Sequence, residues 1–368
     1  MHDSQLRLTE IRSLSEITDY RDTWNDLVEQ SAQATPFQLF EWNIGIAKFE
    51  AERTNLRVVI AENNKGRAVG IAPFWVRHAF VTGPRVLEFI GTGRSDYLDI
   101  LCLDPYIDRF SHALFDWIRQ NGEWSIADLN SITAQRADAI CKHAQFDVQE
   151  FDVCPVARLP DKIDAYEQRL PKRLRQKLRS KRKKLSAEGR LKLSVARTPE
   201  ELEDVLPTFI ELHQKRQRAK GERGRFFDNH WNDAFKEITL QLASSEIVRL
   251  GLAEIDGVPA AAMYNLRLHN REYYYLGGME PGQGAHSPGN LLHHWMIEQA
   301  IGDGVSVYDF GRGDEAYKYM WTDSEIGLSQ LTWAASKMTR TRWLLGRALV
   351  TRLYGNKFLK RAYLRLCD

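Results

Sequence analysis

The sequence predicts an α/β (α+β) protein made of two similar domains, each a mostly antiparallel mixed sheet flanked by helices. Its 368 residues are enough for two domains of ordinary size. The 43% hydrophobic and 27% charged residues are typical of a soluble globular protein. Both halves also show the same order of patterns, namely a strand, two helices, several antiparallel strands, a helix and a strand.

In the first half, alternating apolar residues predict strands and helical spacing predicts helices. The expected elements are a strand at 6–11, helices at 15–31 and 36–51, strands at 56–60, 68–76, 86–91 and 97–103, a helix at 107–120 and a strand at 124–129. An Asn-Asn-Lys-Gly turn separates the second strand from the third.

The second half repeats this order. The expected elements are a strand at 191–196, helices at 199–219 and 228–243, strands at 248–255, 258–268 and 271–277, a helix at 287–302 and a strand at 305–310. Asp256-Gly257 predicts a hairpin turn. Helix starts at Thr35-Pro36, Thr198-Pro199 and Ser287-Pro288 share one signature, because a hydroxyl caps the helix and proline fits its first position.

The segment between the halves is strongly basic, with ten Lys or Arg residues and no acid from residue 169 to 184. Leucines at 170, 174, 178 and 185 keep helical spacing, which predicts a single basic helix. This helix is either a solvated connector or a positive face for a polyanionic substrate, such as a nucleotide-linked or lipid-diphosphate-linked molecule. The predicted boundaries are 1–160 for an N-terminal domain, 161–189 for the basic linker helix, 190–336 for a C-terminal domain and 337–368 for a basic amphipathic tail.

Composition also limits the location of the protein and its cofactors. The sequence has no charged-then-apolar leader pattern and no apolar run near twenty residues, so we expect a cytoplasmic protein. The tail carries nine basic residues and one acid, and it either packs on the domain or contacts the inner membrane face peripherally. The four cysteines lack Cys-x-x-Cys spacing, so we expect neither disulfides nor a metal site.

The most informative stretch is residues 286–321. Its helix start at Ser287-Pro288 presents free backbone N–H groups, which favour an anion. The strand at 305–310 ends in a polar cluster of Asp309, Arg312, Asp314, Glu315, Tyr317, Lys318 and Tyr319. Together they predict a site that holds a phosphorylated donor and carries out chemistry beside it.

These features resemble the GNAT superfamily of acyltransferases, in particular the double-GNAT proteins grouped with FemAB-type transferases and with the CelD/BcsL proteins of bacterial cellulose and exopolysaccharide production. The residues that carry the resemblance are Thr35-Pro36-Phe37-Gln38, Glu41-Trp42, Gly91, Ser95-Asp96-Tyr97, Asp99, Glu211-Leu212-His213, Ser287-Pro288-Gly289, Tyr308-Asp309-Phe310-Gly311, Gly313-Asp314-Glu315 and Tyr317-Lys318. The resemblance covers nearly the whole chain and implies two tandem GNAT-like domains, with the donor site in the second.

The resemblance implies transfer of an acyl group from acetyl-CoA or another acyl-CoA to an amine or hydroxyl. The pantetheine arm would enter between the strands at 272–279 and 305–310, and the pyrophosphate would rest on the loop and helix start that follow the first. The residues expected to bind the donor are Gln283, Gly284, Ser287, Gly289, Asn290 and Leu291. The usual Gln/Arg-x-x-Gly-x-Gly/Ala motif is only partly present, and FemAB-type members use aminoacyl-tRNA, so that donor is the alternative.

The chemistry is expected at the end of the last strand. Asp309 and Glu315 are candidate general bases, because a carboxylate near apolar neighbours can have a raised pKa. Tyr317 and Lys318 are candidates to stabilise the leaving thiolate or the tetrahedral oxyanion. The alternative is structural, in which Asp309 only caps a turn and Tyr317 only packs.

The resemblance to double-GNAT proteins also implies that the acceptor lies between the domains. Asp96 and Tyr97 would contact it from the first domain, while Phe226 and Trp231 would line its pocket; the alternatives are a polar turn and buried helix aromatics. The resemblance implies that this acceptor is a small molecule or glycan precursor of cell-surface polysaccharide metabolism. Two other functions stay open: a FemAB-like transferase with tRNA as its only nucleic-acid partner, and a non-catalytic membrane-surface accessory protein of a polysaccharide synthesis complex.

Overall fold

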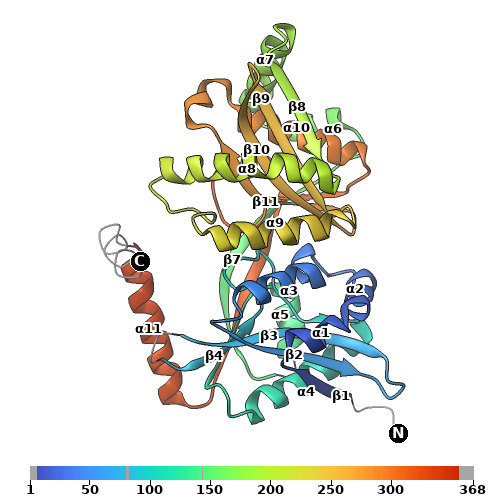
Figure 1. Cartoon of the computed structure of the whole chain (residues 1–368), viewed down its shortest axis with the longest axis vertical. Helices are drawn as coiled ribbons and strands as arrows, with labels where there is room; N and C mark the ends of the chain where they lie inside the picture. The colour runs from blue at the N-terminus through green and yellow to red at the C-terminus, as the bar shows by residue number, and fades with distance from the viewer. Residues whose placement is uncertain (1–5, 80–82, 143, 356–368) are drawn as a thin grey trace.

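A computed structural model describes residues 6–79, 83–142 and 144–355, and in these ranges thirteen strands form one continuous sheet (Figure 1). The first half supplies β1 (Arg7–Ile11), β2 (Asn55–Glu62), β3 (Ala68–His78), β4 (Arg85–Phe89), β5 (Leu101–Cys102), β6 (Ile126–Thr133) and β7 (Asp147–Arg158). The second supplies β8 (Leu191–Ala196), β9 (Val248–Ile255), β10 (Val258–Leu268), β11 (Arg271–Met279), β12 (Val307–Asp309) and β13 (Ser324–Ala334). The strand order is β1-β2-β3-β4-β6-β13-β7-β12-β11-β10-β9-β8, with β5 paired to β3.

Helices pack on this sheet in both halves. The first half contains α1 (Leu14–Thr18), α2 (Arg21–Gln30), α3 (Phe40–Phe49), α4 (Ile107–Gln120) and α5 (Ala134–Cys141). The second contains α6 (Ile163–Arg169), α7 (Lys172–Ala187), α8 (Pro199–Ala219), α9 (Asn229–Ala243) and α10 (Pro288–Gly302), and α11 (Lys337–Gly355) follows β13. In the second half α8 and α9 cover one face of the sheet, while α7 and α10 build a separate core on the other (Figure 1).

Each half contributes its last strand to the other half. β7 of the first half pairs with β12, so that Val156 lies beside Asp309. β13 of the second half inserts between β6 and β7, where Leu331 lies beside Leu129 and Val148. The sequence patterns ended the halves at residues 129 and 310, and α5, β7 and β13 were not predicted. The strand partners are remote in sequence, so no local pattern reveals the exchange.

Most predicted elements have the expected ranges. Five agree at both ends, namely the helices at 107–120 and 199–219 and the strands at 191–196, 248–255 and 258–268. The helix expected at 36–51 begins only at Phe40, because residues Pro36–Gln38 form a 3₁₀ turn. The strand expected at 97–103 is reduced to Leu101–Cys102. The expected hairpin turn is confirmed, since Asp256 and Gly257 both have positive φ.

The single basic helix predicted for the linker is wrong. The structure has two helices there, α6 and α7, which are separated at Leu170 and Pro171. Leu170 is extended, with ψ of 149°, because a residue before proline avoids helical geometry. Leu174, Leu178 and Leu185 are the buried side of α7, which packs against α10. Its exposed sides therefore carry the Lys and Arg residues.

The halves share side-chain packing in addition to the sheet. α3 of the first half packs against α9 of the second. The ring of Phe37 lies 5.3 Å from that of Tyr275 and 6.4 Å from that of Tyr97. The Arg94 guanidinium lies 3.9 Å from the ring of Trp231, within cation–π range. The site described below therefore lies between two firmly joined halves.

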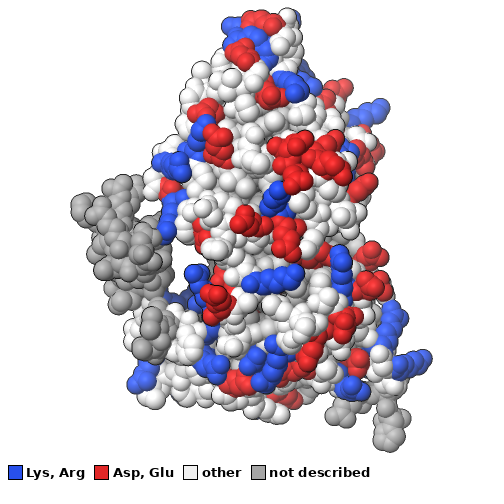
Figure 2. All heavy atoms as spheres, in the orientation of Figure 1, with Lys and Arg blue, Asp and Glu red and all other residues white. Residues whose placement is uncertain are grey.

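The tail helix α11 lies against the first half. Trp343 is buried beside Val86 and Ile126, whereas Met338 and Leu345 are exposed. Residues 356–368 of the predicted tail lie outside the described residues. No helix in the described ranges is long and apolar enough to cross a membrane. On the face shown in Figure 2, Lys and Arg are interspersed with Asp and Glu, so the described part of this face has no continuous basic surface.

Candidate functional site

The site begins where the parallel strands β11 and β12 separate. They are paired from Arg271–Val307 to Tyr273–Asp309, and there β12 ends. The chain then turns through two glycines of positive φ at 311 and 313, while β11 continues to Met279. One side of β11 is therefore unpaired beyond Tyr273 in the described sheet.

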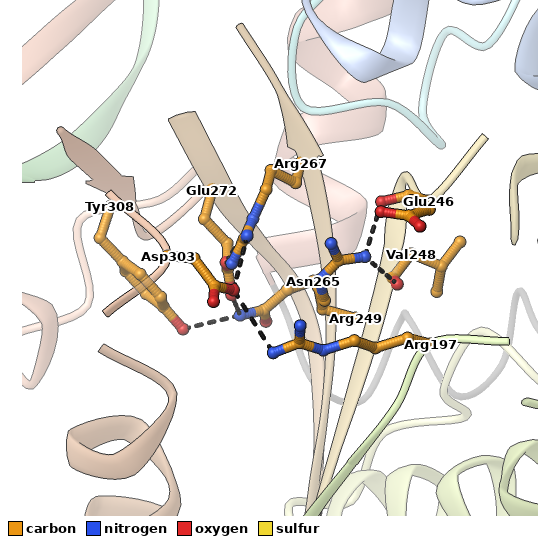
Figure 3. A network of polar contacts seen from close by, with 9 residues as sticks. All are labelled: Arg197, Glu246, Val248, Arg249, Asn265, Arg267, Glu272, Asp303 and Tyr308. Carbon is orange, nitrogen blue, oxygen red and sulfur yellow. Dashed lines mark hydrogen bonds and ion pairs between the residues drawn. The ribbon is translucent and has the colours of Figure 1, made fainter. Parts of the chain in front are cut away.

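A polar network fixes the paired ends of these strands (Figure 3). The buried Asn265 amide on β10 donates to Glu272 on β11 at 2.7 Å and to the Tyr308 hydroxyl on β12 at 2.9 Å. Arg267 joins Glu272, at 2.6 Å, to Asp303 at the end of α10, at 2.8 Å. Three strands and a helix are thus tied together just before the strands separate.

A β-bulge lies on β11 at this separation. Tyr264 of β10 pairs with Leu276 and Asn265 pairs with Tyr274, so Tyr275 has no partner on β10. A bulge leaves its extra residue unpaired and bends the strand, and bulges are frequent next to active sites. The bulge can therefore present backbone N–H groups to a ligand.

A cavity of about 190 Å³ opens at the bulge, between the two halves. It is lined by Asp96 of the first half, His213, Arg216, Gln217 and Lys220 around the end of α8, Arg225, residues 274–277 of β11, and Phe310, Arg312, Glu315, Tyr317 and Lys318. Four of the residues predicted for catalysis or acceptor binding meet here, namely Asp96, Glu315, Tyr317 and Lys318. Segments up to 222 positions apart in the sequence thus form one chamber.

Asp309 and Tyr97 meet each other but do not line the cavity. Asp309 is fully buried; it accepts from the Tyr97 hydroxyl at 2.7 Å and from the backbone N–H of Gly311 at 2.8 Å, and Arg271 lies 3.7 Å away. Burial raises the pKa of Asp309 to about 6. The carboxyl group therefore links the first half to the glycine turn behind the cavity.

Lys318 holds the glycine turn from the other side. Its buried Nζ donates to the carbonyl oxygens of Gly311, Arg312 and Gly313, at 3.1, 2.7 and 3.1 Å, and pairs with Glu315 at 2.8 Å. Burial opposes ionisation of Glu315, but the hydrogen bond and the charge of Lys318, with smaller contributions from the backbone and Lys220, together outweigh burial and lower the pKa of Glu315. Glu315 is thus an ionised, half-exposed carboxylate at the cavity mouth.

Tyr317 lies beside a group of aromatic rings under the cavity. His293 of α10 stacks at 5.2 Å on Phe310 and lies 4.6 Å from the Tyr274 ring and 6.2 Å from the Tyr317 ring. Burial and the neighbouring Tyr274 raise the pKa of Tyr317. Tyr317 is therefore a protonated phenol that can donate a hydrogen bond at neutral pH.

His213 is the main lining residue without a role assigned from the sequence. Its Nδ1 lies 3.1 Å from the carbonyl oxygen of Gly277, which makes Nδ1 the protonated nitrogen, and the lone pair on Nε2 faces the Gln217 amide nitrogen at 3.4 Å. Burial lowers the pKa of His213 to about 4, so the ring is neutral. His213, Arg216, Gln217 and Lys220 recur at helical spacing on α8, and this polar stripe is the signal that could have identified them.

The residues predicted to bind the donor lie at the end of β11, outside the cavity lining. Residues Pro281–His286 form a 3₁₀ segment, and α10 begins at Pro288 as expected. The Ser287 cap is wrong, because Ser287 is left-handed, with φ of 57°, and its side chain makes no cap bond. A Cβ at Gly284 would meet nothing within 4 Å, and one at Gly289 only Met279 at 3.8 Å, so a ligand could approach this backbone closely. Leu291 lines a different cavity of about 470 Å³ with α7, and Gln283 and Asn290 flank the two glycines.

The two aromatics predicted to line the acceptor pocket are in the core. Phe226 packs against Phe209, His213 and Phe235. Trp231 is 1% exposed, under Arg94. Within the described ranges, no group of three His, Cys, Asp or Glu side chains is placed to hold a metal ion.

Known proteins share this architecture. Residues 172–319 match the family described as an acetyltransferase (GNAT) domain. Similar solved structures include FemX (TM-score 0.63, 14% identity, 88% of this chain and 96% of that one) and L-PGS from Bacillus licheniformis (0.53, 12%, 84% and 96%). A tandem GNAT protein from the clavulanic acid biosynthesis pathway has a TM-score of 0.51 at 11% identity, over 90% of this chain and 99% of that one. No curated protein matches the sequence.

Proposed function

We propose that this chain, which has a GNAT-superfamily, FemAB-related fold, is an acyltransferase that takes an acyl group from an acyl-CoA thioester and transfers it to an amine or hydroxyl. The observation that carries the proposal is the separation of β11 and β12 at a bulge that opens into a cavity. The start of α10 follows this bulge after a short glycine-containing segment, where the backbone is open to a phosphate.

The lining residues suit the parts of such a reaction. The acceptor nitrogen would attack the thioester carbonyl, a C–N bond would form and the C–S bond would break. Backbone N–H groups at the bulge would receive the developing oxyanion, and the Tyr317 phenol would donate a hydrogen bond to the leaving thiolate, which takes up the proton released by the amine. Two groups in the cavity can accept the proton of the amine, namely the Glu315 carboxylate and Nε2 of neutral His213.

Asp309 and Lys318 have positioning roles in this scheme. Both bind the backbone of the glycine turn, and Lys318 also holds Glu315. Replacing His213 by Gln and Glu315 by Gln in turn separates the two candidate bases. The one that accepts the proton should lower kcat and remove the acidic limb of the kcat–pH profile, while the other leaves that limb in place.

The test of the function is calorimetric titration with CoA and acetyl-CoA, together with thiol release on a panel of amines. Binding below millimolar concentration with amine-dependent thiol release is the expected result. Failure of both donors to bind in that range would remove the acyl-CoA proposal. The placement of the acceptor in cell-surface polysaccharide metabolism rests on the resemblance to CelD/BcsL proteins alone.

An aminoacyl-tRNA donor is the second candidate, favoured by the basic sides of α7. Arg179 pairs with Glu167 and Arg182 with Glu298, while Lys residues of the same helix remain exposed to solvent. This candidate expects tRNA to copurify and to be lost when the cations between residues 172 and 184 are neutralised. Salt-sensitive liposome binding without any acyl transfer would instead favour a membrane-surface accessory protein.

A further inference from the structure

The cavity at the β11 bulge contains more positive than negative charge. Among its described lining residues are five cations, Arg216, Lys220, Arg225, Arg312 and Lys318, and two carboxylates, Asp96 and Glu315. His213 adds no charge, because burial lowers its pKa to about 4. The excess positive charge is located in a recess. Solvent and salt screen it less there than they would on the open surface.

Two of these cations are paired within the protein. Lys318 is 2.8 Å from Glu315. Arg312 is 3.8 Å from Asp152 and also donates to the Ser131 hydroxyl at 3.1 Å. Their charges are therefore largely committed to the fold.

Arg216 and Arg225 have only neutral acceptors. Arg216 donates to the carbonyl oxygen of Gly277 at 3.2 Å and to a tyrosine hydroxyl at 3.4 Å. Arg225 donates to the carbonyl oxygen of Arg94 and to a tyrosine hydroxyl, both at 2.8 Å. Neither arginine forms an ion pair within the described residues. Asp96 is the nearby carboxyl group: burial raises the pKa of Asp96, and the charge of Arg225 offsets part of that rise.

We propose that the acceptor substrate carries an oxyanion, phosphoryl or carboxyl, which Arg216 and Arg225 bind, with Lys220 at the rim. A partly buried cation without a counter-ion is unfavourable, so an arriving anion restores the balance. The planar guanidinium fork matches phosphate and carboxylate oxygens, and such charge-assisted bonds are strong. The word "acceptor" rests on the proposed function, whereas the anion site itself does not.

The residues that line the cavity indicate that the bound anion belongs to the acceptor substrate and not to the donor. The six residues predicted for the donor do not line it, while Asp96 comes from the first half and three lining side chains come from α8. The anion would therefore bind on the α8 side of β11, opposite the face covered by α10. An amine next to the anion would then lie at the bulge.

Thermal unfolding with inorganic phosphate or acetate, at ionic strength held constant with chloride, tests the site without any donor. The wild type should be stabilised by at least one of these anions more than by chloride. Arg216→Gln and Arg225→Gln should each weaken that binding about tenfold, the loss expected for one charge-assisted hydrogen bond. Lys220→Gln, at the exposed end of α8, should weaken it about threefold without disturbing the fold. Arg119→Gln, on the exposed side of α4 and outside the cavity, should change nothing.

No stabilisation beyond chloride would overturn the proposal, as would equal losses in Arg119→Gln. If the two arginine variants do not fold, Lys220→Gln decides alone. Thiol release with glucosamine 6-phosphate, glutamate and glucosamine then separates the sources. A preference for the first indicates a phosphoryl group and for the second a carboxyl group, while a preference for glucosamine, which has no anionic group, overturns the acceptor assignment. Anion binding without thiol release from any donor would keep the anion site and remove the acyl transfer.

Discussion

In both halves three antiparallel strands are followed by a helix and a parallel strand, namely β2-β3-β4-α4-β6, with the short β5 before α4, and β9-β10-β11-α10-β12. Among the described residues, only the second half has a gap between its parallel strands. In the first half, β4 pairs with β6 at Val86 and Leu87, and the following loop returns along β6, where the Leu98 N–H donates to Ser131 at 3.0 Å. In the second half the chain leaves β11 directly for α10, and the equivalent space is the cavity. The loop that fills the first half also places Asp96 in the site of the second. A loop of the first half thus forms part of the cavity lining in the second half.

Lys318→Ala should have the largest effect. It removes a contact that only the second half has: a lysine holds the turn after β12, whereas in the first half α5 starts directly after β6. Three carbonyl oxygens and Glu315 would lose their partner. We expect stability to fall by about 4 kcal/mol and turnover by about 100-fold with donor affinity nearly unchanged. Urea unfolding and calorimetry measure these. Tyr319→Phe, an exposed neighbour, is the control, and an equally active Lys318→Ala would remove Lys318 from the site.

Asp309→Asn tests the link between the halves through pH. The pKa of Asp309 is about 6 in the folded protein, above the ordinary value of about 3.9. Between these values the folded state binds more protons, so the free energy of unfolding falls as the pH rises from about 4 to about 6, by about 3 kcal/mol. In Asp309→Asn, the free energy of unfolding measured with urea should no longer decrease between about pH 4 and about pH 6. The exposed Asp314→Asn should keep it, and an unchanged slope in Asp309→Asn would contradict the raised pKa.

Gly311→Ala and Gly93→Ala form a matched pair across the halves. Both glycines have positive φ, of 65° and 82°, so both alanines carry a similar backbone cost. A Cβ at Gly311 would lie 2.5 Å from the Asp96 carboxylate and 2.8 Å from a backbone oxygen, whereas one at Gly93 meets nothing within 4 Å. Gly311→Ala should therefore be less stable by about a further 2 kcal/mol in chemical denaturation. Equal losses would show that the turn is not crowded.

Ser95→Ala should have the smallest effect. It removes only the hydrogen bond from the Trp42 indole to the Ser95 hydroxyl at 2.9 Å, which orders the loop that fills the first half. We expect a loss of about 1 kcal/mol and a few-fold rise in acceptor KM through the adjacent Asp96, with donor affinity unchanged. A rise in the KM for the donor instead would indicate that this loop contacts the donor, which contradicts its proposed place beside the acceptor.

Local signals predicted the order of elements, and remote contacts account for what they missed. The proline-marked start of α8 and the Asp256-Gly257 turn need only their own neighbours, and both were predicted correctly. β13 could not be, because its partners are about 200 positions away. Lys318 was predicted from its place in the polar cluster after the last strand, but its backbone partners depend on a turn that only the tertiary fold creates. The polar stripe of α8 has the pattern of a solvent-exposed face, and only the tertiary fold places it in a cavity opposite Asp96.

The exchange of β7 and β13 sets an order for biosynthesis. A ribosome that has finished β6 and β7 has produced two strands that do not pair with each other directly, since β13 lies between them. β13 ends at Ala334, so it emerges only after β8 to β12 have been made. The sheet of the N-terminal half therefore stays open between β6 and β7 until the strands of the second half have been synthesised. Nascent chains stalled at residue 190 should be protease-sensitive in this half, and those extended beyond residue 334 resistant.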